Sequence, residues 1–332
     1  AEQVDVDVTD PATRAYLETI LDRMAEAGVS SVRLDAVGYA VKTAGTTSFM
    51  TMETYDFIDE LAGWCRERGL EVLVEIHSHF EQQIAIAKRV DRVYDFALPP
   101  LVLHGITSGD ATALARWLEV QPRNAVTVLD THDGIGVVDV AASGEQPGLL
   151  SNQQVDDLVE MIHQLSGGTS QMATGEAASN VDLYQVNSTF YDALGADDDA
   201  YLLARAIQFF TPGIPQVYYV GLLAGRNDTD LLNRTGVGRN VNRHHFTRTE
   251  IEDELQRPVV QALLSMIRFR NECVAFDGVF SHSEKGTGLE MRWKNGGTVA
   301  VLDADFALRR GRISVTEPES GTTDYSVWEL PG

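Results

Sequence analysis

The sequence has 332 residues, of which 44% are hydrophobic and 23% charged, a composition typical of a soluble globular protein with a sizeable core. Its formal net charge of -23 argues against nucleic acid and anionic membrane surfaces as partners, because an acidic protein and a polyanion repel each other. Cys65 and Cys273 provide no disulfide framework and suit a cytoplasmic location, and no apolar run approaches the ~18 residues of a membrane-spanning helix.

The first part of the chain predicts helices and strands in alternation. A capping side chain followed by proline at 9–11 starts a helix, and Gly28 stops it. The apolar stretch SVRLD (31–35) predicts a strand, apolar residues at helical spacing over 57–65 predict a second helix, and LEVLVEI (70–76) predicts a second strand.

The same alternation continues to about residue 130. A short helix is expected near 81–89, and the segments RVYDFAL (92–98) and NAVTVLD (124–130) predict two more strands. Strands that are apolar on both faces favour a parallel sheet between helices, either open and doubly wound or closed as a TIM barrel. The segment DGIGVVD lacks the third glycine of a dinucleotide-binding loop, since position 139 is Asp.

Beyond residue 145 the rhythm changes. A polar, glycine-rich stretch predicts a loop-rich insertion over 145–195, and 221–246 predicts a second long loop. Between them, 201–210 has a helical pattern and PQVYYVG (215–221) predicts a strand, and a further helix is expected near 257–270.

The end of the chain predicts a small antiparallel β domain. Leu289, Met291 and Trp293 alternate with polar residues, and the following Asn-Gly-Gly at 295–297 supplies a turn. The pattern of the chain therefore changes at about residues 145, 196 and 276.

Three acidic residues follow apolar strands. Asp35, Glu75 and Asp133 each lie at or just past the carboxyl end of a predicted strand, the face that carries the active site in TIM barrels. Two carboxyl groups about 5 Å apart suit retaining glycoside chemistry, one as nucleophile and one as acid/base. From the pattern alone, Arg33 beside Asp35 fits a structural ion pair equally well.

The histidines leave a second interpretation open. His77 and His79 form an HxH at a strand end, and His132 precedes Asp133, so a metal-dependent TIM-barrel hydrolase could be built from these side chains. Adjacent histidine and aspartate residues do not easily bind one ion together, which makes loop or substrate-contacting histidines the simpler interpretation.

Several of these stretches resemble the sucrose phosphorylases within the α-amylase superfamily of glycoside hydrolases. VRLDAVGYA matches the nucleophile segment of that superfamily, VEIHSHF the acid/base segment, and VLDTHDGIG the segment with the transition-state-stabilising aspartate. SNVDLYQVNSTFY and GRNVNRHHF resemble loops typical of the phosphorylases. The resemblance implies a partial (β/α)8 TIM barrel with a small C-terminal antiparallel β domain. It assigns 1–144 to the first part of the catalytic barrel, strands four to seven, 145–195 to a loop-rich insertion, 196–275 to the last part of the barrel and 276–332 to the β domain.

The resemblance also implies residue roles. Asp35 would be the nucleophile, Glu75 the general acid/base, and Asp133 the stabiliser of an oxocarbenium-like transition state, with Arg33 orienting Asp35. The other implied substrate-binding residues are His132 and Arg239 at the glucosyl unit, and Tyr39, His77, Asp182, Tyr184 and Gln185 on the acceptor side.

The implied reaction is the reversible, retaining phosphorolysis of sucrose to α-glucose 1-phosphate and fructose through a covalent glucosyl-enzyme. Relatives that act on sucrose 6-phosphate, glucosylglycerol or glucosylglycerate remain alternatives. Neither cofactor nor metal is expected, and a homodimer is left open. Phosphate needs local positive charge in so acidic a protein, which Arg239, Arg243, His244 and His245 could supply, although Arg243 and His245 equally fit a loop ion pair or solvent exposure.

One part of the family pattern is missing. The first signature segment, an early strand with Asp and His, does not occur, and residue 1 corresponds to a point near the end of the insertion after the third strand. The chain is therefore expected to be the C-terminal portion of such an enzyme and to be inactive or poorly folded by itself.

Overall fold

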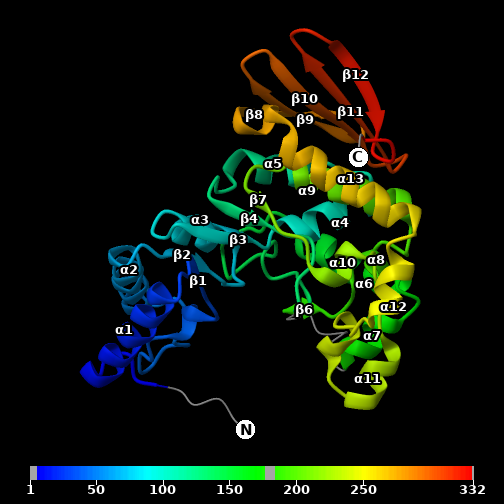
Figure 1. Ribbon diagram of the computed structural model, residues 1–332. Coiled ribbons are helices and arrows are strands. Elements are labelled where there is room, and N and C mark those ends of the chain that lie inside the picture. Colours follow the sequence, from blue (N-terminus) through cyan, green and yellow to red (C-terminus); the bar gives the residue numbers. More distant parts are fainter. Residues whose placement is uncertain (1–5, 176–183, 331–332) are drawn as a thin grey trace. The chain divides into compact units, whose positions relative to one another are not determined.

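The computed structural model describes residues 6–175 and 184–330, and the chain divides into two compact units. The first unit contains the described residues up to Asp95 together with Pro122–Val126. The second contains Phe96–Gln121 and the described residues from Thr127 onward. Strand β4 (Ala125–Thr127) leads from one to the other (Figure 1).

The first unit is a parallel sheet with helices. Strand β1 (Ser31–Leu34) pairs in parallel with β2 (Glu71–Val74), and β2 pairs in parallel with β3 (Arg92–Asp95). The start of β4 lies next to β3, since the Val93 amide donates to the carbonyl of Asn124, the residue directly before β4. Between these strands the chain forms α1 (Pro11–Glu26), a 3-10 helix η1 (Val37–Tyr39), α2 (Met52–Glu67) and α3 (Phe80–Ala87).

Local sequence explains the first helices. Helix α1 begins where the Asp10 side chain accepts the Ala12 and Thr13 amides, and the chain leaves the helix at Gly28, which has a φ of +79°. Helix α2 buries Phe57, Ile58, Leu61 and Cys65 in the same hydrophobic core as Val72 and Val74 of β2. The predicted start and end of α1 and the predicted apolar face of α2 are confirmed, whereas α2 is longer than the predicted 57–65.

Strand β1 presents its two kinds of side chain to opposite faces. Val32 and Leu34 pack against the core, whereas Ser31 and Arg33 are exposed. Because side chains alternate along a strand, Asp35, directly after β1, continues the face of Arg33.

The second unit combines helices with short strands. Strand β7 (Ile214–Pro215) adjoins β4, where the Gln216 amide donates to the Thr127 carbonyl. Strands β5 (Ile135–Gly136) and β6 (Gln185–Val186) form an antiparallel pair. The helices are α4 (Leu98–Ser108), α5 (Thr112–Val120), α6 (Asn152–Leu165), α7 (Thr169–Thr174), α8 (Phe190–Ala193), α9 (Asp198–Phe210), α10 (Tyr219–Leu222), α11 (Thr229–Thr235), η3 (Gly238–Asn242), α12 (Arg248–Glu254), α13 (Pro258–Glu272) and η4 (Val274–Asp277).

The predicted C-terminal antiparallel sheet is present (Figure 1). Leu289, Met291 and Trp293 point to its buried face, and the chain turns between β9 and β10 through Gly296, which has a φ of +55°. The strand order is β12-β11-β10-β9-β8, formed by β8 (Val279–Lys285), β9 (Gly288–Asn295), β10 (Thr298–Asp305), β11 (Arg310–Glu317) and β12 (Gly321–Ser326).

Three predictions are corrected by the structure. The strand expected at 215–221 is wrong beyond its first residue, because β7 ends at Pro215 and α10 begins at Tyr219. The loops expected over 145–195 and 221–246 contain helices, foremost α6, whose capping box of Ser151 and Gln154 satisfies the orphan amides at its start.

In the described part of the chain the parallel sheet does not close into a barrel. No helix there combines the length and the apolar character needed to cross a membrane.

Candidate active site

Asp35 and Glu75 lie at matching positions of neighbouring strands. Leu34 and Val74, the last residues of β1 and β2, are direct partners in the parallel register, and the acids follow them. The Glu75 amide donates to the Leu34 carbonyl over 3.0 Å, so the pairing reaches the acidic positions themselves. Both carboxylates therefore arise at the same edge of the sheet.

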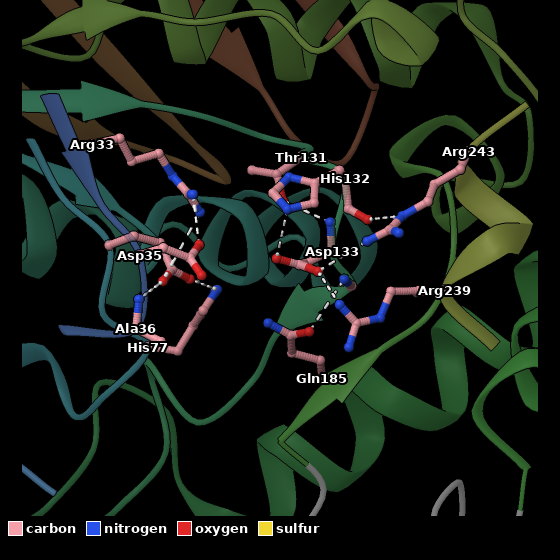
Figure 2. Close-up of polar contacts among 12 residues, drawn as sticks. Arg33, Asp35, Ala36, His77, Thr131, His132, Asp133, Gln185, Arg239 and Arg243 are labelled. Atoms are coloured by element: carbon pink, nitrogen blue, oxygen red, sulfur yellow. Dashed lines mark hydrogen bonds and ion pairs between the residues drawn. The ribbon is translucent and has the colours of Figure 1, made fainter. Parts of the chain in front are cut away.

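The Arg33 guanidinium faces both carboxylates, and Figure 2 shows it pointing toward Asp35. Its Nη1 donates to Asp35 Oδ1 over 2.6 Å, and its Nη2 lies 4.0 Å from Glu75 Oε2. Burial lowers the pKa of Arg33, but the hydrogen bond and charge of Asp35 and the charge of Glu75 outweigh it, so the net shift is upward. A permanently charged guanidinium thus offsets the repulsion between two neighbouring acids.

The surroundings of the two acids differ. Glu75 is only 9% exposed, its Oε2 accepts the Ala36 amide over 2.9 Å, and its Oε1 lies 3.8 Å from Nε2 of the buried His77. The side chain of Asp35 is 66% exposed. Ala36 has a φ of +46°, a conformation that costs energy for a residue with a side chain and that aims its amide at Glu75.

A second cluster surrounds Asp133 in the loop after β4 (Figure 2). Asp133 Oδ1 lies 3.2 Å from Arg239 Nη1 and 3.4 Å from Arg243 Nη2, and Oδ2 lies 3.3 Å from His132 Nε2. Arg243 also donates to the His132 carbonyl over 2.7 Å, and Asn242 donates to the Asp133 carbonyl over 2.7 Å. Side chain and backbone of this loop are therefore both held by the segment around η3.

Gln185 supports the other side of the Asp133 loop. Its Oε1 accepts the Gly134 amide over 3.3 Å, and it pairs with Gly136 in the two-stranded sheet of β5 and β6. A Cβ atom on Gly134 would lie 2.8 Å from the Val186 carbonyl oxygen, so only glycine allows this approach.

The structure gathers most of the expected residues into these two clusters, one in each unit. Arg33, Asp35, Glu75 and His77 belong to the first unit, and His132, Asp133, Arg239 and Gln185 to the second. Tyr39 and Tyr184 are about half exposed, and the Tyr39 ring packs 4.7 Å from that of Phe49. Asp182 lies outside the described residues.

The basic residues Arg239, Arg243, His244 and His245 leave less positive charge free for phosphate than the sequence suggests. Arg243, left open between an ion pair and a phosphate contact, pairs with Asp133, and His244 Nδ1 lies 2.6 Å from Asp228 Oδ2. His245 is exposed. The sequence analysis allows an ion pair for Arg243 but names no partner for it, and it does not single out Asn242. The sequence carries no local signal for partners so far apart.

The histidines of the HxH motif have local partners. His77 lies against Glu75, and His79 Nδ1 accepts the Glu81 amide over 3.4 Å at the start of α3. Among the described residues no group of three or more His, Cys, Asp or Glu side chains is placed to hold a metal ion.

Comparison with known proteins gives no match to any family model. The chain is 58% identical over 98% of its length to a sucrose phosphorylase from Agrobacterium vitis, and 51% identical over 93% to one from Bifidobacterium adolescentis, covering 66% and 62% of those proteins. It is 42% identical to a sucrose 6(F)-phosphate phosphorylase from Thermoanaerobacterium thermosaccharolyticum, with 98% of the chain and 67% of that protein matched. The chain thus spans about two thirds of the length of these relatives.

Solved structures agree with these relatives. The crystal structure of sucrose 6F-phosphate phosphorylase from Thermoanaerobacter thermosaccharolyticum superposes with a TM-score of 0.90 at 40% identity, covering 98% of this chain and 65% of that one. An α-amylase from H. orenii, at 14% identity and a TM-score of 0.64, covers 96% of this chain and 63% of that one and shares the fold. The chain belongs to the family of sucrose phosphorylases and related glucoside phosphorylases.

Proposed function

We propose that the protein is a retaining glucoside phosphorylase that transfers the glucosyl unit of sucrose to phosphate. The observation that carries the proposal is the placement of Asp35 and Glu75 after paired strands, with Arg33 in contact with Asp35 and 4.0 Å from Glu75, in a chain 58% identical to a sucrose phosphorylase. Retaining glycoside chemistry needs two neighbouring carboxyl groups in different roles.

The contrast between the two acids supports their assignment. Asp35 is exposed and aligned by Arg33, which suits a nucleophile that must reach the anomeric carbon. Glu75 is buried beside His77 and the Ala36 amide, which suits a group that gives a proton to the leaving fructosyl oxygen and later takes one from the acceptor. The covalent β-glucosyl enzyme is then attacked by phosphate, and α-glucose 1-phosphate leaves with its configuration retained.

The cluster around Asp133 is assigned to glucosyl binding. A carboxylate fixed by Arg239 and His132 is suited to accept hydrogen bonds from sugar hydroxyls and to stabilise an oxocarbenium-like transition state. Arg239, with a side chain 56% exposed, is also the basic residue here best placed to meet a ligand from solvent. Tyr39, His77, Asp182, Tyr184 and Gln185 are proposed for the acceptor side.

The choice of sucrose as the donor rests on similarity to named relatives. Two relatives named sucrose phosphorylase reach 58% and 51% identity, and a third reaches 40%, against 42% for a sucrose 6(F)-phosphate phosphorylase and 40% for a glucosylglycerol phosphorylase. The two highest identities favour sucrose. Cys65 and Cys273, both free thiols, support a cytoplasmic location as part of the proposal.

A donor panel tests this proposal. The protein, expressed from the whole reading frame that contains these 332 residues, is incubated with phosphate and one of sucrose, sucrose 6-phosphate, glucosylglycerol or glucosylglycerate. We expect α-glucose 1-phosphate and fructose from sucrose, at a kcat/KM above those of the other donors. Faster turnover of another donor would reassign the substrate, and loss of activity with a chelator would favour the metal-dependent alternative.

A further inference from the structure

A row of polar side chains lies in the core of the second unit, behind the Asp133 loop. Tyr201, Arg205 and Gln208 project from one face of α9, at positions i, i+4 and i+7, and all three are 0% exposed. Buried polar groups are normally hydrogen-bonded, so their partners show what they hold.

Arg205 is at the centre of this row. Its Nη2 donates to Asp130 Oδ2 over 2.7 Å, its Nη1 donates to Gln208 Oε1 over 2.8 Å, and both Nε and Nη2 contact the Tyr201 hydroxyl. The Tyr201 hydroxyl in turn donates to the Gly221 carbonyl. Nearly the whole guanidinium fork is used, a pattern that a lysine cannot reproduce.

These contacts link two segments that lead into the Asp133 cluster. Asp130 lies three residues before Asp133, and Gly221 lies two residues after Tyr219, whose hydroxyl donates to the His244 carbonyl next to Arg243. Gln208 joins the strands below them, since its Nε2 donates to the carbonyls of Thr127 and Gln216 over 2.9 Å each.

The packing around the pair leaves no slack. A Cβ atom on Gly221 would lie 1.8 Å from Asp130 Oδ2 and 2.2 Å from Arg205 Nη2. A buried ion pair contributes little net stability compared with apolar residues of the same shape, so stability alone does not account for it. What the pair supplies is a fixed position and direction for the chain at Asp130.

We propose that Arg205 is a positioning residue for the Asp133 loop. Through Asp130 it fixes the start of the segment that carries His132 and Asp133, and through Tyr201 it fixes the segment that leads to Tyr219 and the Arg243 loop. The inference rests on the proposed function, in which Asp133 stabilises the transition state. A misplacement near 1 Å at such a group lowers kcat on the order of 10²-fold.

Three variants separate positioning from charge compensation. Arg205→Met leaves Asp130 buried without a cation, whereas the double variant Arg205→Met with Asp130→Asn removes the charge imbalance but also the tether. Arg205→Lys keeps the charge and loses the fork. Leu203→Ala is the matched control, because Leu203 is equally buried in α9 and packs toward Gly311 of the C-terminal sheet.

The readouts are the melting temperature, kcat and KM for phosphorolysis, and hydrogen exchange of peptides that cover 128–137. We expect the double variant to regain the melting temperature that Arg205→Met loses, yet to keep a kcat lowered on the order of 10²-fold with a far smaller change in KM. Hydrogen exchange of residues 128–137 is expected to rise in Arg205→Met and in the double variant. Arg205→Lys falls between wild type and Arg205→Met in kcat, and Leu203→Ala lowers only the melting temperature.

Recovery of kcat together with the melting temperature in the double variant would overturn the inference, because charge compensation would then be the whole role. Unchanged exchange over 128–137 in Arg205→Met would overturn it too, and this readout does not depend on activity. A wild-type protein that turns over none of the donors would instead overturn the proposed function, while exchange would still decide whether Arg205 positions the loop.

Discussion

Arg33 and Asp35 face the same side of β1, and their partners explain why. The guanidinium contacts Asp35 at 2.6 Å and approaches Glu75 at 4.0 Å, so one cation serves two acids with different exposure. The spacing of Arg33 and Asp35 made this pair readable from the sequence, since residues two apart in a strand share a face. Its approach to Glu75 depends on the register of β1 and β2, which the sequence does not contain.

Arg33→Lys is expected to lower kcat on the order of 10²-fold while the protein remains folded, because a lysine is a single point charge and cannot align Asp35 and face Glu75 together. Steady-state phosphorolysis with sucrose measures the effect. Arg92→Lys is the matched control, since Arg92 also lies in a strand and pairs with Glu71 at 3.4 Å. Equal kcat in the two variants would contradict the role of Arg33.

His104 is a buried titratable group outside both clusters. It is 6% exposed, and burial lowers its pKa below the ordinary value of 6.5, outweighing the charges of Asp110 and Asp157. The unfolded chain therefore takes up a proton near pH 6.5 that the folded chain resists. The stability that a neutral His104 allows is present above that pH and is lost as pH falls below it.

His104→Gln should weaken this loss. Urea unfolding at about pH 7.5 and about pH 5.5 measures the free energy of unfolding of wild type and variant. We expect the wild type to lose more stability than the variant on going to the lower pH. Equal losses of unfolding free energy in the two proteins would show that groups other than His104 determine the loss of stability at low pH.

Helix α6 lies in a segment for which the sequence analysis predicts a loop. The expectation of a loop over 145–195 followed its glycine and serine content, whereas Ser151 and Gln154 form a capping box and Val155, Leu158 and Ile162 are buried at helical spacing. Those signals lie in the printed sequence, but they are short. The two-residue strands β5, β6 and β7 carry no periodicity at all, because their existence depends on tertiary partners.

The cap of α6 can be tested alone. Ser151→Ala should lower the free energy of unfolding by about 1 kcal/mol, because the Gln154 amide loses its side-chain acceptor. Ser151→Asp, which keeps an acceptor at the cap, is expected to remain close to wild type. A chemical denaturation series measures both, and equal losses would mean that the cap contributes nothing measurable.

For the whole molecule, the elements with a regular apolar period could be predicted from the sequence, whereas contacts between residues far apart in the sequence could not. The alternation of helices and strands and the terminal antiparallel sheet follow from periodicity, and both are present. The contacts of Asp133 with Arg239 and Arg243 join residues 106 and 110 positions apart, which no local pattern encodes. Family resemblance named Arg239, but only the fold shows Arg243 and Asn242 beside it.

The net charge of -23 makes a prediction about phosphate. A negative molecule lowers the local concentration of an anion, and salt screens that repulsion over about 8–10 Å at physiological ionic strength. We therefore expect kcat/KM for phosphate to rise as inert salt is added from low ionic strength. Sucrose is neutral, so its kcat/KM should stay flat and serves as the internal control; a fall for phosphate would point to a dominant local cation instead.

The proposed mechanism requires a glucosyl group carried covalently by Asp35. In the Glu75→Gln variant, an activated donor such as α-glucosyl fluoride needs no protonation of its leaving group, while transfer from the enzyme to water lacks its base. Mass spectrometry of the digested variant should find a glucosyl adduct on the peptide with Asp35, and none after Asp35→Asn. An adduct on another residue, or no adduct despite release of fluoride, would contradict the role of Asp35 as the nucleophile.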